Sequence, residues 1–73
     1  MLDVLALRHA MLDANCSASA LAKACEISPS ALYRRMCGDV PFNLKEITRC
    51  CDRLDLNPER RDEIFFAPEF TKS

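Results

Sequence analysis

The side chains best suited to chemistry lie in the segment SPSALYRRMC, residues 28–37. If this segment is a helix, about 100° separates successive residues, so Leu32 and Met36 point to one side. The opposite side then carries Pro29, Ser30, Tyr33, Arg34 and Cys37. Guanidinium, phenol and serine hydroxyl groups on one face are hydrogen-bond donors for an acceptor-rich partner. An Arg34–Arg35 pair in an arbitrary helix is most often a solvated face, so the elements around it must decide between the two interpretations.

Catalysis and metal binding are disfavoured by the spacing of the reactive residues. The five cysteines, an odd number, contain no C-x-x-C pair and suit neither a closed disulfide framework nor a zinc site. Cys25, Cys50 and Cys51 stand where helical periodicity favours a small apolar residue, which predicts buried free thiols. His9 has no Ser, Cys or carboxylate partner at a convincing spacing. We therefore expect no enzyme, no cofactor, no metal and no evident small-molecule ligand.

Length and composition predict a single helical domain over residues 1–73. The chain is 49% hydrophobic, which suffices for one small core. It contains one glycine, and its apolar residues recur at spacings of three and four, as in helices. No stretch reaches the roughly 18 to 20 apolar residues of a membrane span, and the opening MLDVLALRHAML lacks the features of a signal peptide. We expect a cytoplasmic protein with no membrane partner.

Start and stop signals divide the chain into five helices. The first is predicted from about Leu2 to Asp13, with Asn15 as a left-handed stop. Polar residues that cap helix starts precede the other four: Ser17, Ser28, Asn43 and Asn57. Gly38 ends the third helix, and the last helix and tail occupy residues 58–73. The buried stripe of the fourth helix is predicted to consist of Leu44, Ile47, Cys50, Cys51 and Leu54.

A very tight turn joins the second and third helices. Only three positions separate the last residue of the second apolar stripe, Cys25, from the cap Ser28. Helices joined so closely cannot run antiparallel and must cross at a large angle. Packing the two apolar stripes together leaves the face with Tyr33 and Arg34 projecting, and an α-helix fits the DNA major groove. Residues 17–37 are therefore predicted to be a helix-turn-helix whose partner is double-stranded DNA.

The segment LAKACEISPSALYRRMCGD resembles the helix-turn-helix of lambda-repressor-like (Xre or Cro type) phage regulators. Ala22, Ile27 and Leu32 match that motif's inner positions. The segment FNLKEITRCCDRLDLNPERRDEIFF is similar to the last two helices of small prophage regulators of this group. The resemblance implies an all-α, compact five-helix bundle and a sequence-specific transcriptional regulator, a repressor. The sequence departs from the pattern at Glu26, where relatives usually have glycine, and at Ala18, where many have glutamine.

The resemblance also implies which residues contact DNA. Ser28, Ser30, Tyr33 and Arg34 match positions that reach base edges and nearby phosphates, and an arginine can bond both acceptors of a guanine. The starts of the second and fourth helices are expected to hold phosphates through amides and charge. The predicted DNA-binding residues are Ser17, Ser19, Ser28, Pro29, Ser30, Tyr33, Arg34, Arg35, Asn43 and Lys45.

Weak charge predicts a homodimer. The net charge is −1, although residues 28–53 are locally basic and the tail is acidic. One copy makes few phosphate contacts, so two copies reading two half-sites are expected to supply affinity. The predicted interface consists of Ile64, Phe65, Phe66 and Phe70, with Leu5 or Leu12 of the first helix. Alternatively, these aromatic residues close the core.

A second function remains open on the sequence alone. The near-neutral charge, Ala18 and Glu26 favour a protein-binding module, in which the same fold inhibits or bridges another protein. Salt dependence distinguishes the two functions, because operator binding weakens steeply as salt rises.

Overall fold

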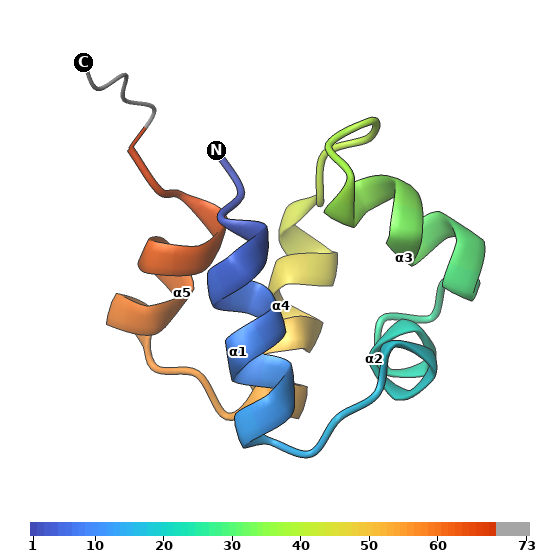
Figure 1. Ribbon diagram of the computed structural model, residues 1–73, viewed down its shortest axis with the longest axis horizontal. Helices are drawn as coiled ribbons and strands as arrows, with labels where there is room; N and C mark the ends of the chain where they lie inside the picture. The colour runs from blue at the N-terminus through green and yellow to red at the C-terminus, as the bar shows by residue number, and fades with distance from the viewer. Residues whose placement is uncertain (69–73) are drawn as a thin grey trace.

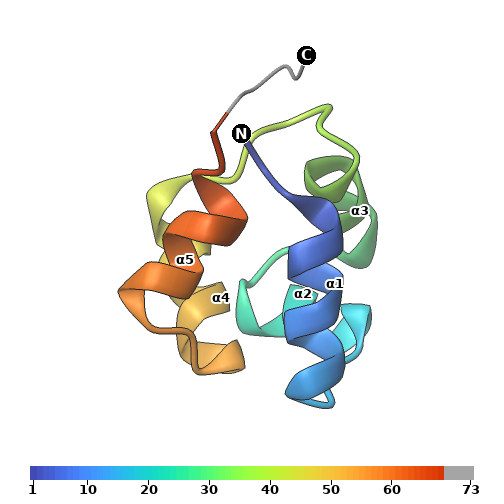
Figure 2. The same cartoon turned by 60° about the vertical axis from the view of Figure 1, so that its left-hand side comes forward.

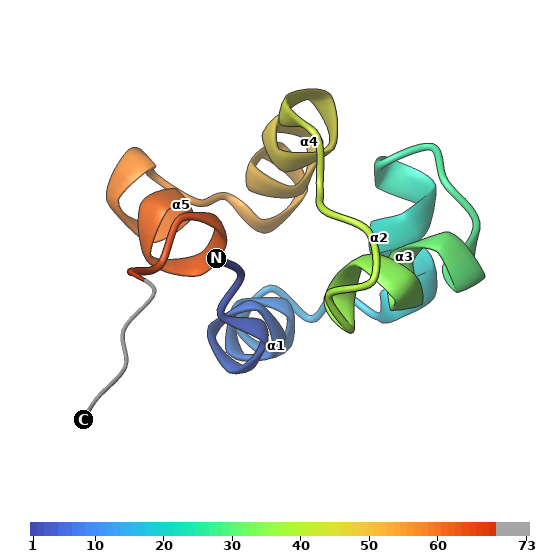
Figure 3. The same ribbon diagram turned by 90° about the horizontal axis from the view of Figure 1, so that it is seen from above.

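A computed structural model describes residues 1–68 of the chain, and this part is built from five helices (Figure 1). They are α1 (Val4–Asp13), α2 (Ala18–Ala24), α3 (Pro29–Met36), α4 (Leu44–Leu54) and α5 (Pro58–Phe65). The all-α prediction is confirmed. Seen from above, α5 lies at one end of the molecule and α2 with α3 at the other, while α1 and α4 lie between them (Figure 3).

Each helix begins after a polar residue whose side chain accepts a hydrogen bond from the backbone three residues on. The four predicted caps are confirmed, and Asn43 forms a full capping box with Glu46. A fifth cap, Asp3, accepts from the Ala6 amide at 3.1 Å. Because Asp3 occupies the cap position, α1 starts at Val4 rather than at Leu2 as the sequence had suggested.

The core lies between the helices and uses small and branched side chains. Leu7 of α1, Leu21 of α2, Leu32 of α3, Cys50 of α4 and Ile64 of α5 are all within 1% of complete burial. Figure 2 shows α1 and α5 side by side, and two backbone bonds join their ends. The Asp3 amide donates to the Ile64 carbonyl at 2.7 Å, and the Ala67 amide donates to the Met1 carbonyl at 3.0 Å.

The α4 stripe differs from its prediction at its first residue. Leu44 is 74% exposed, whereas Ile47, Cys50 and Leu54 are buried and Cys51 is half-buried. Phe42, just before the cap, covers this end of the core instead. Its ring meets that of Phe65 edge to face, with 5.2 Å between centroids. Leu44 is therefore left at the surface.

Two of the cysteines that were predicted to be buried, Cys25 and Cys50, lie next to each other in the core. Cys25 and Cys50 are buried free cysteines, and their sulfur atoms are 3.3 Å apart. Burial raises the pKa of each thiol. The prediction that these positions carry buried free thiols is confirmed, and both sulfurs serve as packing between α2 and α4.

No helix within residues 1–68 is both long and apolar enough to cross a membrane.

Candidate nucleic-acid interface

The turn between α2 and α3 closes through backbone bonds. Cys25 ends α2, and Glu26 takes a left-handed backbone with a φ of 62°. The Ile27 amide then reaches back to the Ala22 carbonyl at 3.0 Å, which satisfies a carbonyl at the helix end. The chain leaves in a new direction, and Ser28 with Pro29 starts α3 at once. Glu26 thus adopts the backbone that glycine usually supplies here.

Packing holds α3 across α2 (Figure 1). Leu32 on the inner side of α3 is 1% exposed, and Leu21 and Ala22 of α2 are buried to the same degree. A small alanine at this contact lets the two helix backbones approach closely. The outer side of α3 is consequently turned away from the protein.

The outer face of α3 presents the side chains that the sequence analysis assigned to it. Pro29, Ser30, Tyr33, Arg34 and Cys37 are exposed, Tyr33 by 65%. The Tyr33 hydroxyl has an ordinary pKa near 10 and a neighbour, Cys37, that raises this pKa, so at neutral pH it is a protonated hydrogen-bond donor. The face therefore offers a phenol, a hydroxyl and a guanidinium within two helical turns.

Arg35, which belongs to the predicted DNA-binding set, points away from this outer face and toward α4. Its Nε donates to Glu46 Oε1 at 2.8 Å, and its Nη2 donates to Glu46 Oε2 at 3.0 Å. The Arg35 side chain is only 17% exposed. Arg34 and Arg35 are adjacent in sequence, but about 100° of helix rotation sends one outward and the other toward α4.

The helix starts have their cap oxygens occupied by backbone. Ser17 Oγ accepts from the Ala20 amide at 3.1 Å, and Ser28 Oγ accepts from the Ala31 amide at 3.0 Å. Asn43 Oδ1 likewise accepts from the Glu46 amide at 2.8 Å. These three side chains are structural caps whatever else they contact. Ser19 and Lys45 are exposed beside the starts of α2 and α4.

A groove of about 400 Å³ runs between α1 and α3. Met11, Leu32 and Met36 line its apolar floor. Its polar rim includes Ser17 and Tyr33 together with Arg8 of α1, a residue outside the predicted DNA-binding set. Arg8 lies outside the helix-turn-helix, so no spacing rule within the motif connects it to Tyr33.

The predicted dimer residues separate into two groups. Ile64 and Phe65 are 0% and 6% exposed, so their side chains belong to the core, which is the alternative that the sequence left open. Phe66 is 49% exposed, and Leu5 and Leu12 of α1 are more exposed still. Phe70 lies outside the described residues.

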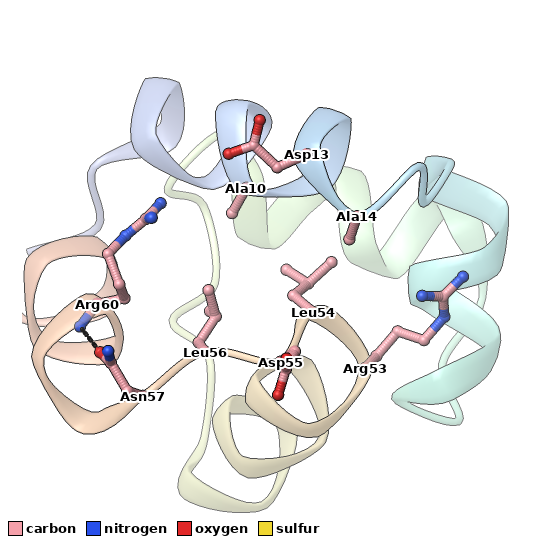
Figure 4. A pocket seen from close by; sticks show the side chains of 9 residues that line it. All are labelled: Ala10, Asp13, Ala14, Arg53, Leu54, Asp55, Leu56, Asn57 and Arg60. Atoms are coloured by element: carbon pink, nitrogen blue, oxygen red, sulfur yellow. Dashed lines mark hydrogen bonds between the residues drawn. The ribbon is translucent and has the colours of Figure 1, made fainter.

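A polar cleft of about 540 Å³ lies between the end of α1 and the α4–α5 connection (Figure 4). Asp13 and Asp55 line it together with Arg53 and Arg60, so its charges balance. None of the predicted DNA-binding residues lines this cleft.

Comparisons with known proteins agree with this geometry. A family model described as a helix-turn-helix domain matches residues 5–64. No curated protein and no solved structure matches the chain. Because the match runs through all the described helices and covers well over half of the chain, the protein belongs to the helix-turn-helix domain family.

Proposed function

We propose that this protein is a sequence-specific transcriptional regulator, a repressor of the lambda-repressor-like (Xre/Cro) prophage type, that reads the DNA major groove with α3. One observation carries the proposal: Tyr33 and Arg34 project from a helix whose opposite face, at Leu32, is buried against α2. A helix held in this way can enter a groove without unfolding any part of the core. The proposal includes a cytoplasmic location and no catalytic activity.

Arg34 is assigned to sequence reading. Its exposed guanidinium has the donor geometry for the two major-groove acceptors of guanine, a contact that distinguishes base pairs by about 1 to 3 kcal/mol. Ser30 and Tyr33 lie beside Arg34 on the same face of α3, about one helical turn from each other. From there they can reach a neighbouring base or a phosphate. These are the contacts that give preference for one operator over another.

Phosphate contacts are assigned to the helix starts. The amides of Leu44 and Lys45 precede the first intrahelical bond of α4, which the Ile47 amide donates to the Asn43 carbonyl. Such amides are natural anion donors, and the Lys45 ammonium adds charge beside them. Ser17 and Ser19 supply the equivalent contact at α2. These groups position the domain without reading bases.

The homodimer remains part of the proposal because one copy has few basic side chains for phosphate contacts, so it releases few counterions on binding. The exposed apolar residues Met1, Leu5 and Phe66 gather where the start of α1 meets the end of α5. Tyr33 and Arg34 line neither of the two pockets at this end of the molecule. Pairing through this end leaves both α3 helices free for two half-sites.

The second candidate function is a protein-binding module. The apolar groove beside Leu12, which is 76% exposed, is the observation that favours it. Such a module binds a protein partner with little dependence on salt and enriches no DNA sequence.

Selection from a pool of random duplexes at low salt tests the proposal, followed by affinity measurements on the enriched sequence. Replacing Arg34 by alanine removes the bidentate donor, so we expect the affinity for that sequence to fall by about 1 to 3 kcal/mol and selectivity to relax at one base pair. Arg61→Ala is the matched control, because it removes the same charge from α5 at the far end of the molecule.

Enrichment of no sequence by the wild-type protein would reject a DNA-reading function. An equal loss in the Arg34 and Arg61 variants would reject the role of Arg34. Sedimentation of the free protein and of its complex with the selected duplex measures how many copies bind each site, and a single copy on the duplex contradicts the dimer.

A further inference from the structure

The orientation of α3 is fixed by two different kinds of contact. Against α2 it packs closely, with its Leu32 buried at the contact, whereas its backbone approaches α4 at few places. The strong contact to α4 is the Arg35–Glu46 ion pair. Loss of that pair would leave α3 attached to α2 and less constrained relative to α4.

The Arg35–Glu46 pair is part of a longer bridge. At one end, Arg35 Nη1 donates to the Ala31 carbonyl within α3 at 3.1 Å. At the other, Glu46 Oε1 also accepts from the Asn43 amide at 3.2 Å, at the cap of α4. One continuous set of hydrogen bonds therefore runs from a backbone carbonyl of α3 to the backbone amide of Asn43, the cap of α4.

Burial restricts the Arg35–Glu46 pair to a single arrangement. Glu46 is 5% exposed, and among residues 1–68 it is the one charged residue that is buried. The Arg35 guanidinium beside it, followed by the Asn43 amide, holds the pKa of its carboxyl below the usual value. A buried ion pair adds little stability compared with apolar residues of similar volume, but a bidentate pair has one well-defined geometry. Its main effect is thus on orientation.

We propose that the Arg35–Glu46 bridge is a positioning device, which sets α3 at a fixed angle to the start of α4 so that both engage one DNA duplex in register. Neither side chain contacts DNA. The inference rests on the proposed function, in which α3 reads bases and the start of α4 holds a phosphate. It assigns to Arg35 a role through Glu46 in place of direct contact.

The angle between α3 and α4 matters because the base contact and the phosphate contact tolerate misplacement to different degrees. A lysine or an amide binds a phosphate over a range of positions, whereas an arginine fork on guanine needs both of its bonds aligned. Suppose that the start of α4 stays bound to a phosphate while α3 rotates slightly. The base contacts of α3 are then weakened before the phosphate contact is. Binding to random DNA, which depends on charge, is expected to change little.

The test uses the full chain and the duplex that the wild-type protein selects. Affinities for that duplex and for a random duplex are measured over a salt series for Arg35→Met, Glu46→Gln and the double variant. Glu46→Gln keeps an oxygen acceptor for the Asn43 amide and loses the charge. Glu63→Gln, an exposed glutamate on α5 paired with Arg60, is the matched control. Circular dichroism melting establishes that each variant is folded at the assay temperature, and Arg35→Lys replaces Arg35→Met if the latter is not.

We expect each single variant to lower the ratio of selected to random affinity by about 2- to 30-fold, with the salt slope unchanged. The double variant is expected to lose no more than either single variant, because all three break the same bridge. Glu63→Gln leaves the ratio unchanged.

Two results overturn the inference while the proposed function stands. One is an unchanged ratio in folded variants, which shows that the bridge does not affect base reading. The other is an equal loss on both duplexes with a salt slope reduced by about 1 for the Arg35 variant, which indicates a direct phosphate contact. If the wild-type protein selects no sequence, the proposed function fails and the inference fails with it.

Discussion

At the scale of single residues, the interface extends beyond the helix-turn-helix to Arg8. This residue belongs to α1 but lines the same groove as Ser17 and Tyr33. Arg8 is exposed, and it shares this groove with residues at the start of α2, where the proposed function places a phosphate. Arg8 is therefore suited to a contact that adds affinity without reading sequence.

Replacing Arg8 by alanine is expected to weaken binding to selected and random duplexes by a similar factor and to reduce the salt slope by about 1. Affinities measured over a salt series check this, with Arg61→Ala again as the charge-matched control. A loss confined to the selected duplex would contradict a phosphate contact and indicate base reading by Arg8.

At the scale of elements, the α2–α3 turn combines an unfavourable backbone with a weak compensating contact. Glu26 adopts the left-handed backbone conformation. This conformation is unfavourable for residues other than glycine, because their β-carbon crowds the following carbonyl oxygen. Its carboxylate lies 3.3 Å from Arg49 Nη1, but the Glu26 side chain is 70% exposed, so the ion pair contributes little. The tight turn is thus maintained by its backbone hydrogen bonds and by the packing of α2 against α3.

Glu26→Gly is expected to raise the free energy of unfolding by about 0.5 kcal/mol, because relief of the left-handed strain exceeds the entropy cost of glycine and the lost ion pair. Urea denaturation measures the change. Asn15→Gly is the control: Asn15 has a φ of 53°, and asparagine tolerates that region well, so a smaller effect is expected. A destabilised Glu26 variant would show that the Arg49 contact outweighs the strain.

At the scale of the whole molecule, the buried Glu46 carboxylate couples stability to pH. Its pKa in the folded protein lies below the ordinary value of 4.5, chiefly because Arg35 donates to it. A depressed pKa contributes stability above the ordinary value, and that stability is lost as the pH falls through the lowered pKa. The five-helix fold is therefore expected to become less stable in acid.

Glu46→Gln removes the titrating group, so its melting temperature is expected to fall less than that of the wild-type protein between about pH 5 and pH 3. Thermal melts across this range measure the difference. The Glu63 side chain is 68% exposed, so Glu63→Gln is expected to follow the wild-type curve closely. Parallel curves for the wild type and the Glu46 variant would show that other carboxyl groups control acid sensitivity.

The sequence by itself determined the local features of this protein. Helix starts at Ser17, Ser28, Asn43 and Asn57 could be predicted because a cap bonds to an amide only three residues away. The outward face of α3 followed from helical periodicity and from the tight turn before it. These features depend on neighbours in the chain, which a single sequence displays.

Only the tertiary structure decided which side chains meet across the fold. Arg35 and Glu46 are 11 residues apart and Cys25 and Cys50 are 25 apart, and no local pattern pairs them. Phe42 covers the core where Leu44 was expected, and Phe65 closes the core, a choice between core and dimer surface that the sequence left open. Burial and pairing depend on how whole helices pack, so side chains of the same type can serve as core, cap or surface. For this reason Arg34 projects from the protein while Arg35, its neighbour in the chain, is turned toward α4 and paired with Glu46.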